Sequence, residues 1–236
     1  MSLLSLFRHR KEILKTLERF GAYKDGKFVV IDKIDLGFQG LMGAELWQHP
    51  DVIRAALEGD LEKENLIRRR VLGLLRAGIS LPLERTMQVS GANTWFAEGI
   101  TNALSVALGY GTQQQNHYFL IGVNDVTPAE AWTLGTSGTK IRTTFGEFTS
   151  YVEAVRQTWT YAAAAAKSIT NSANPAKITC NGSGTLRGAC LVSKSTKDGS
   201  SDNSGYAIAG KRFSVDLPAA TSNEVYITHT LSGSVS

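Results

Sequence analysis

Residues 176–193 read AKITCNGSGTLRGACLVS, and this stretch decides the fold class. Two short runs of apolar and β-branched residues, Ala176–Cys180 and Leu186–Ser193, flank the turn-forming sequence Asn181-Gly182-Ser183-Gly184. Runs of this kind, separated by a glycine-containing break, are typical of antiparallel strands joined as a hairpin. The stretch therefore predicts a β-hairpin, across which Cys180 and Cys190 could face each other.

These two cysteines are the only ones in the chain, which is too few for a disulfide scaffold. We favour the interpretation that both are small buried residues of a protein made in a reducing cytoplasm.

The same strand pattern extends over most of the chain beyond residue 116. Short apolar or alternating runs are separated by turn residues such as Asn124-Asp125, Asn174-Pro175 and Leu217-Pro218. Many short strands at this spacing predict an antiparallel β-sandwich, either immunoglobulin-like or jelly-roll, because spacing does not reveal strand order. The further candidate strands are His117–Val123, Ala131–Leu134, Lys140–Phe145, Tyr151–Tyr161, Tyr206–Ala209, Arg212–Val215 and Val225–Leu231.

Upstream of residue 90 the chain is more charged and its apolar residues recur at helical spacing. The pattern predicts helices over residues 2–20, Pro50–Glu58 and Leu61–Ala77, and one more over Thr94–Leu108. In the helix at Leu61–Ala77 the expected apolar stripe is Leu66, Ile67, Val71, Leu74 and Leu75, and the expected basic face is Arg68-Arg69-Arg70.

The predicted fold class is therefore α+β. Residues 1–90 form a mainly helical attachment region, and residues 91–236 form a β-sandwich domain with one leading helix. The strand at Lys27–Leu36 is the exception expected within the first region.

Composition excludes several classes of protein. Of the 236 residues 42% are hydrophobic and 19% are charged, so the chain can bury a core and is not broadly disordered. No apolar run approaches the roughly 18–20 residues of a membrane span, and the N-terminus lacks the order of a secretory signal. The net charge of +4 is thinly spread, with 15 Lys and Arg against 12 Asp and Glu in residues 1–90, so nucleic-acid binding is not expected.

Motifs that carry chemistry do not stand out. No two of the four histidines lie four residues apart as metal ligands on a helix would, and the glycines at 135–140 lack the spacing of a phosphate-binding loop. No Gly-x-Ser-x-Gly stretch marks a nucleophile. We therefore expect no catalytic residues, no metal and no cofactor. Trp132, Trp159 and Tyr161 could form a sugar platform if exposed, but aromatic residues in strands more often fill a core.

Several stretches between about residue 94 and residue 231 resemble the virion structural proteins of tailed bacteriophages. The resemblance rests on FGEFTSYVEAVRQTWT at 145–160, GTLRGACLVSKSTKDG at 184–199 and NEVYITHTLSGSVS at 223–236, in this order. It implies a non-enzymatic virion protein, assembled in the host cytoplasm, whose C-terminal part is a β-domain.

The resemblance does not fix the place in the virion, and we favour the head, as a capsid decoration, cement or minor capsid protein. We expect a homo-oligomer that binds other virion proteins, either the major capsid protein or connector proteins, and no membrane. The alternatives are a neck, collar or tail component, a carbohydrate- or receptor-binding module, and, least favoured, a hydrolase. The expected assembly interface consists of apolar residues on the N-terminal helices: Leu3, Phe7, Leu14, Leu17, Phe20, Leu66, Val71 and Leu74.

Overall fold

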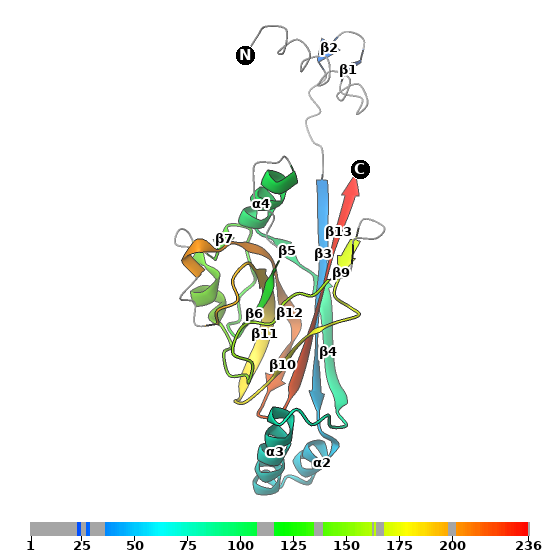
Figure 1. Ribbon diagram of the computed structural model, residues 1–236, viewed down its shortest axis with the longest axis vertical. Helices are drawn as coiled ribbons and strands as arrows, with labels where there is room; N and C mark the ends of the chain where they lie inside the picture. The colour runs from blue at the N-terminus through cyan, green and yellow to red at the C-terminus, as the bar shows by residue number, and fades with distance from the viewer. Residues whose placement is uncertain are drawn as a thin grey trace. The chain divides into compact units, whose positions relative to one another are not determined.

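The computed structural model divides into two compact units, residues 1–37 with 234–236, and residues 38–233 (Figure 1). In the first unit two short strands, β1 (Tyr23–Lys24) and β2 (Lys27–Phe28), pair antiparallel. The predicted helix over residues 2–20 lies outside the described residues. The structure describes residues 23–24, 27–28, 36–107, 116–134, 139–161, 163, 168–197 and 202–235.

The second unit is built on two antiparallel sheets. The larger sheet has the strand order β10-β13-β3-β4, and β9 also pairs with β13. The smaller sheet has the strand order β5-β12-β11-β6. The strands of the larger sheet are β3 (Leu36–Gln48), β4 (Glu84–Ala92), β9 (Ser168–Thr170), β10 (Ala176–Thr179) and β13 (Glu224–Val235). Those of the smaller sheet are β5 (Thr94–Trp95), β6 (Tyr118–Gly122), β11 (Gly184–Val192) and β12 (Ala207–Ala219).

Buried side chains from both sheets form one core, so the sheets face each other as in a sandwich. Met42 and Leu46 of β3, Ile178 of β10, and Leu186 and Leu191 of β11 all belong to it. The sequence prediction of a mixed α+β protein with antiparallel sheets is confirmed at this level. The chain changes sheet between β10 and β11 and again between β12 and β13.

The predicted hairpin over residues 176–193 is wrong. Its two halves are strands, but β10 pairs with β13 in the larger sheet, and β11 pairs with β12 and β6 in the smaller one. The residues between them connect the two sheets. Cys180 belongs to the core between the sheets and Cys190 to a second core, so the two thiols do not face each other, and both are free and buried.

This second core explains why β11 lacks the alternating pattern of a half-exposed strand. In β6, Phe119 and Ile121 point into the core between the sheets, while Leu120 points to the opposite side. There it packs with Phe145 and Cys190. Because both faces of the smaller sheet are covered here, β6 and residues 188–192 of β11 are nearly continuous apolar runs.

The covering layer is the chain between β6 and β9, which departs most from the prediction. The expected strand at 140–145 is a π-helical turn, Arg142–Gly146, and the expected strand at 151–161 has only isolated bridges. Two short strands in this layer, β7 (Trp132–Thr133) and β8 (Thr139–Lys140), pair in parallel.

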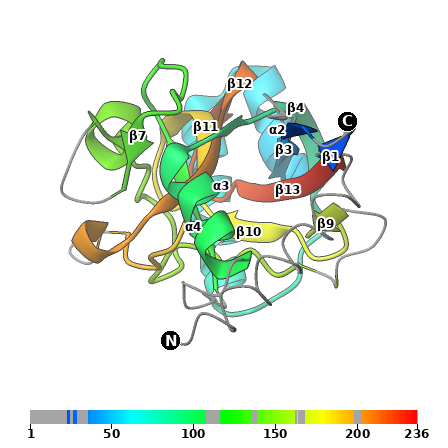
Figure 2. The ribbon, with the colours of Figure 1, turned by 90° about the horizontal axis from the view of Figure 1, so that it is seen from above.

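Two helices connect β3 to β4 and lie at one end of the sheet (Figure 1). The sequence predicted both correctly: α2 spans Pro50–Glu58 and α3 spans Leu61–Arg76. Pro50 opens α2, Gly59 closes it with a φ of 73°, and the Asp60 carboxylate accepts a hydrogen bond from the backbone N–H of Lys63. The third described α-helix, α4 (Ala97–Ala107), follows β5 and lies near the centre of the view in Figure 2.

The sequence analysis placed a domain boundary near residue 90. In the structure β3 lies before that boundary and β4 crosses it, yet the two are adjacent strands of the larger sheet, and the compact unit extends from Phe38 to Gly233. The helical part of residues 36–90 is thus an insertion between two paired strands.

Burial of both faces of the smaller sheet can be tested at Leu120, whose side chain is fully buried on the side away from the sandwich core. We expect Leu120→Ala to lower the free energy of unfolding by about 2–5 kcal/mol, because it leaves a cavity. Val215→Ala on β12 is the control and should change it by less than about 0.5 kcal/mol, because Val215 is 52% exposed. Urea denaturation measures both, and equal small effects would show that the outer face of the sheet is open.

Candidate functional site

The structure describes three of the eight residues of the predicted assembly interface. Leu3, Phe7, Leu14, Leu17 and Phe20 lie outside the described residues.

The three predicted interface residues on α3 do not form one apolar stripe. Leu66 is 69% exposed, Val71 is buried and Leu74 is partly buried. The side of α3 that faces the protein carries Arg68, Val71 and Leu72. The helix is therefore rotated relative to the prediction, so that an arginine lies inside and a leucine outside.

Arg68 causes this rotation, because its side chain ties α3 to the turn between β12 and β13. The guanidinium donates hydrogen bonds to Asn223 Oδ1 at 2.9 Å and to the carbonyl oxygen of Thr221 at 3.2 Å. It also pairs with the Glu64 carboxylate one turn earlier, at 2.7 Å. The sequence analysis placed Arg68 on an exposed basic face, and it missed the two long-range contacts.

The α2–α3 hairpin (Pro50–Arg76) presents large apolar side chains to solvent. Leu57 is 84% exposed and Leu61 is 72% exposed, and the two flank the tight connection at Gly59-Asp60. With Leu66 they give one small helical hairpin three exposed leucines. Three exposed leucines on so short a hairpin make it a candidate surface for binding another protein.

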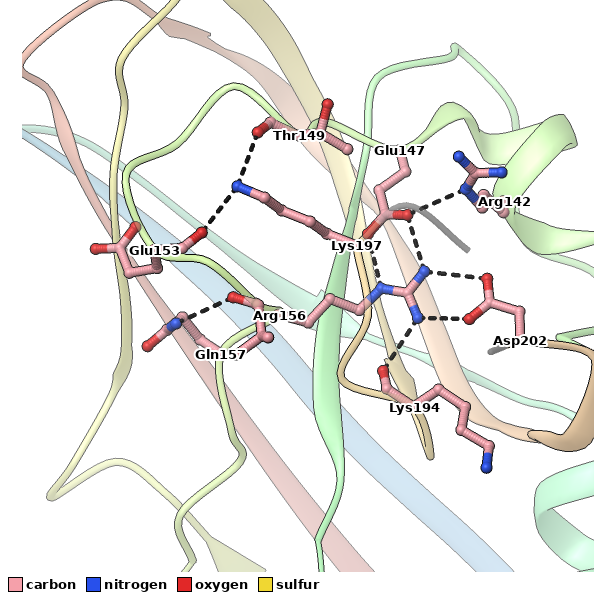
Figure 3. A network of polar contacts seen from close by, with 10 residues as sticks. Arg142, Glu147, Thr149, Glu153, Arg156, Gln157, Lys194, Lys197 and Asp202 are labelled. Carbon is pink, nitrogen blue, oxygen red and sulfur yellow. Dashed lines mark hydrogen bonds and ion pairs between the residues drawn. The ribbon is translucent and has the colours of Figure 1, made fainter. Parts of the chain in front are cut away.

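A second cluster of polar residues lies around Arg156, in the layer that covers the smaller sheet (Figure 3). Its side chain is fully buried, and all five of its N–H donors have acceptors. Nε and Nη2 donate to the two oxygens of Glu147 at 2.7 and 2.8 Å. Nη1 and Nη2 donate to the two oxygens of Asp202 at 2.8 and 3.1 Å, and Nη1 also donates to the carbonyl oxygen of Lys194 at 3.0 Å.

Burial alone would lower the pKa of Arg156, but its hydrogen bonds to the carboxylates of Glu147 and Asp202 outweigh burial, and the pKa is raised above its usual value. One buried cation thus faces two buried carboxylates. Arg142, 42% exposed at the rim, adds a second positive charge at 3.5 Å from Glu147. A buried group of this kind holds segments together in a fixed geometry, since removing one partner leaves a buried charge unpaired.

Lys197 holds the chain at residues 149–153, close to the Arg156 cluster, by hydrogen bonds to backbone carbonyls (Figure 3). Its ammonium donates to the carbonyl oxygens of Thr149, Tyr151 and Glu153 at 3.2, 3.0 and 2.8 Å. The same Nζ lies 4.1 Å from the centre of the Tyr151 ring, where a cation is attracted to the aromatic face.

The segment held by Arg156 and Lys197 covers the outer edges of both sheets. The N–H groups of Phe119 in β6 and of Phe148 bond to the carbonyls of Gln157 and Ile121, at 2.9 and 2.8 Å. The N–H of Val152 bonds to the carbonyl of Thr179 in β10 at 2.9 Å. Residues 147–159, the closing segment, thereby occupy edges that would otherwise pair with another chain.

Two hollows lie on the second unit. The larger, about 380 Å³, is lined by Trp47, the loop after α3 and β13; there Glu224 already accepts from Lys177 and from the Tyr226 hydroxyl, at 3.0 and 2.6 Å. The smaller, about 210 Å³, lies between α4 and the aromatic side chains of Trp95, Trp159 and Tyr161.

Two of the three aromatic residues considered as a sugar platform are core residues. Trp132 is 7% exposed and packs on Phe145, and Trp159 is 4% exposed and donates a hydrogen bond to the carbonyl of His229. Tyr161 alone is exposed, at 37%, with its ring 4.7 Å from that of Trp159. The favoured interpretation, core packing, is confirmed for the two tryptophans.

Burial also shifts the pKa of titratable groups outside the Arg156 cluster. Burial lowers the pKa of His117 to about 4 and that of His229 to about 3, and it raises the pKa of Cys180 to about 12. Among the described residues no three of His, Cys, Asp and Glu lie close enough together to hold a metal ion. Nor does any helix described here have the length and apolarity of a membrane span.

Comparison with known proteins adds no family. No protein-family model matches the chain, and no curated protein or solved structure matches it significantly.

The structural role of Arg156 gives a direct prediction. Arg156→Met should lower the free energy of unfolding by about 3–5 kcal/mol, because Glu147 and Asp202 remain buried without their partner. Arg142→Met, the control at the exposed rim, should cost at most about 1 kcal/mol. Denaturant unfolding measures the difference, and limited proteolysis should cut within residues 147–159 in the first variant only. Equal stability of the two variants would contradict this role.

Proposed function

We propose that the protein is a non-enzymatic structural subunit of a tailed-bacteriophage virion. Its place is on the head, as a capsid decoration, cement or minor capsid protein. The observation that carries the proposal is the α2–α3 hairpin, which is held on the sandwich by Arg68 and exposes Leu57, Leu61 and Leu66. The sequence resemblance over residues 145–160, 184–199 and 223–236 supports the same assignment.

The sheets and the α2–α3 hairpin would have separate roles in such a subunit. The two sheets, closed along one side by residues 147–159, form a scaffold with a core of its own. The helical hairpin is an insertion at one end of that scaffold, between β3 and β4. Specific protein–protein interfaces bury roughly 1,200–2,000 Å² in total, so the hairpin would supply the apolar centre of a larger contact. Repetition on a symmetric shell would add avidity.

The partners in this proposal are the major capsid protein or connector proteins, together with further copies of the chain. Assembly takes place in the host cytoplasm. A neck, collar or tail position is the alternative, since the same hairpin could bind a connector ring. The connections that cross between the sheets occur in both immunoglobulin-like and jelly-roll sandwiches, so the choice between these topologies stays a prediction.

The proposal predicts that the hairpin leucines are needed for attachment but not for folding. A variant with Leu57→Ser, Leu61→Ser and Leu66→Ser should fold, because all three side chains are exposed. Supplied to a phage that lacks the wild-type gene, it should be found on purified particles at roughly a tenth of the wild-type level or less, as expected when the apolar centre of an interface is removed.

Val215→Ser is the matched control, because it makes the same kind of change at a residue of β12 that is 52% exposed. Particles that carry the triple variant at the wild-type level would refute the hairpin as the attachment element. Removal of residues 1–20 tests Leu3, Phe7, Leu14, Leu17 and Phe20 in the same assay.

A further inference from the structure

The outward side of α3 combines charge, an apolar residue and a glycine in a way that the fold itself does not require. Its residues are Leu66, Arg69, Arg70, Gly73 and Arg76, which recur at spacings of three and four along the helix and are all exposed. We call this surface the outer face of α3. It lies opposite Arg68, Val71 and Leu72, which the helix buries.

The three arginines of the outer face have no ion pair within the part of the chain that the structure describes. The acidic residues of α3, Glu62 and Glu64, are both in its first turn, and Glu64 already pairs with Arg68. From residue 65 to the end of α3 the helix contains no carboxylate. The outer face therefore has an uncompensated positive charge beside an exposed leucine.

Gly73 lies among these residues, and nothing in the fold explains it. A Cβ atom at Gly73 would meet no atom within 4 Å. The residue sits inside an ordinary α-helix, where glycine is less stable than alanine. Other glycines of the chain have a visible reason: at Gly188 a Cβ would lie 2.2 Å from the carbonyl oxygen of Lys211. A glycine on an exposed helix face lets another chain approach the backbone closely.

We propose that the outer face of α3 docks an acidic protein surface, with the partner's backbone or side chain packed against Gly73 and its carboxylates paired with Arg69, Arg70 and Arg76. This rests on the proposed function, because it names the chemistry of the virion protein that the hairpin binds. Carboxylates are the complement of three unpaired guanidiniums, which bind them with two parallel hydrogen bonds each.

Charge argues against the other occupants. A second copy would bring the same arginines together, and like charges in contact oppose association. The chain's own residues 1–22 are basic as well, with five Lys and Arg against two Asp and Glu. A nucleic acid would satisfy the arginines, but it leaves Leu66 and Gly73 without a role, since phosphate contacts dominate such interfaces.

The test measures the amount of full-length protein on purified particles. Arg69→Glu with Arg70→Glu should lower it roughly tenfold or more, because reversed charges repel the acidic partner. Gly73→Leu should lower it to a similar degree by blocking close approach. Gly73→Ala should raise the melting temperature of the free protein by about 2–4 °C, since alanine stabilises an exposed helix. Lys140→Glu, a charge reversal at an exposed residue of β8 outside the hairpin, is the control and should stay at the wild-type level.

The possible results distinguish a failure of the proposed function from a failure of the docking face alone. Wild-type protein missing from particles would refute the proposed function itself. Wild-type protein present, with the arginine and Gly73→Leu variants equally abundant, would refute the docking face alone. Binding of a fluorescent DNA duplex, or a dimer in analytical ultracentrifugation, that is lost in the arginine variant would assign the face to nucleic acid or to a second copy instead. Rescue of Arg69→Glu/Arg70→Glu by an acidic-to-basic change in another virion protein would support the proposal.

Discussion

The second unit depends on one buried guanidinium. Arg156 gathers Glu147, Asp202 and the carbonyl of Lys194 into a cluster in which each of its five donors is satisfied. The closing segment contains both Glu147 and Arg156, and it runs along the outer strands of both sheets. Together with backbone hydrogen bonds to β6 and β10 and three hydrogen bonds from Lys197, this cluster holds on the sheet edges a segment that has little regular secondary structure.

Arg68 performs a similar task at the end of the molecule where the helices lie. Its hydrogen bonds join α3 to the turn between β12 and β13, so the exposed leucines of the α2–α3 hairpin are presented on a rigid support. Two buried arginines, each hydrogen-bonded to residues of other segments, thus connect the irregular and the helical parts of the chain to the sheets. The apolar cores stabilise the sheets, and these polar contacts determine where the attached segments lie.

Local signals in the sequence were sufficient for α2 and α3 and for the strands β6, β10, β11, β12 and β13, but they missed β3, β4 and β9. Pro50, Gly59 and Asp60 mark the ends of α2 and α3, and both helices were predicted. Pairing was not predictable, because the break at Asn181–Gly184 suits a hairpin as well as a crossing between sheets. The rotation of α3 was missed for a related reason: the partners of Arg68, Thr221 and Asn223, are more than 150 residues away. An arginine at a helix position that periodicity assigns to solvent carries no sign of such a contact.

The most direct test of this account is the number of copies of the protein in purified phage particles, measured by quantitative mass spectrometry against the major capsid protein. A head-associated subunit that follows the capsid lattice should be present on the order of hundreds of copies per particle, whereas a neck or tail ring holds roughly a dozen. A lattice-scale copy number is the predicted result. Absence of the chain from purified particles would contradict the account.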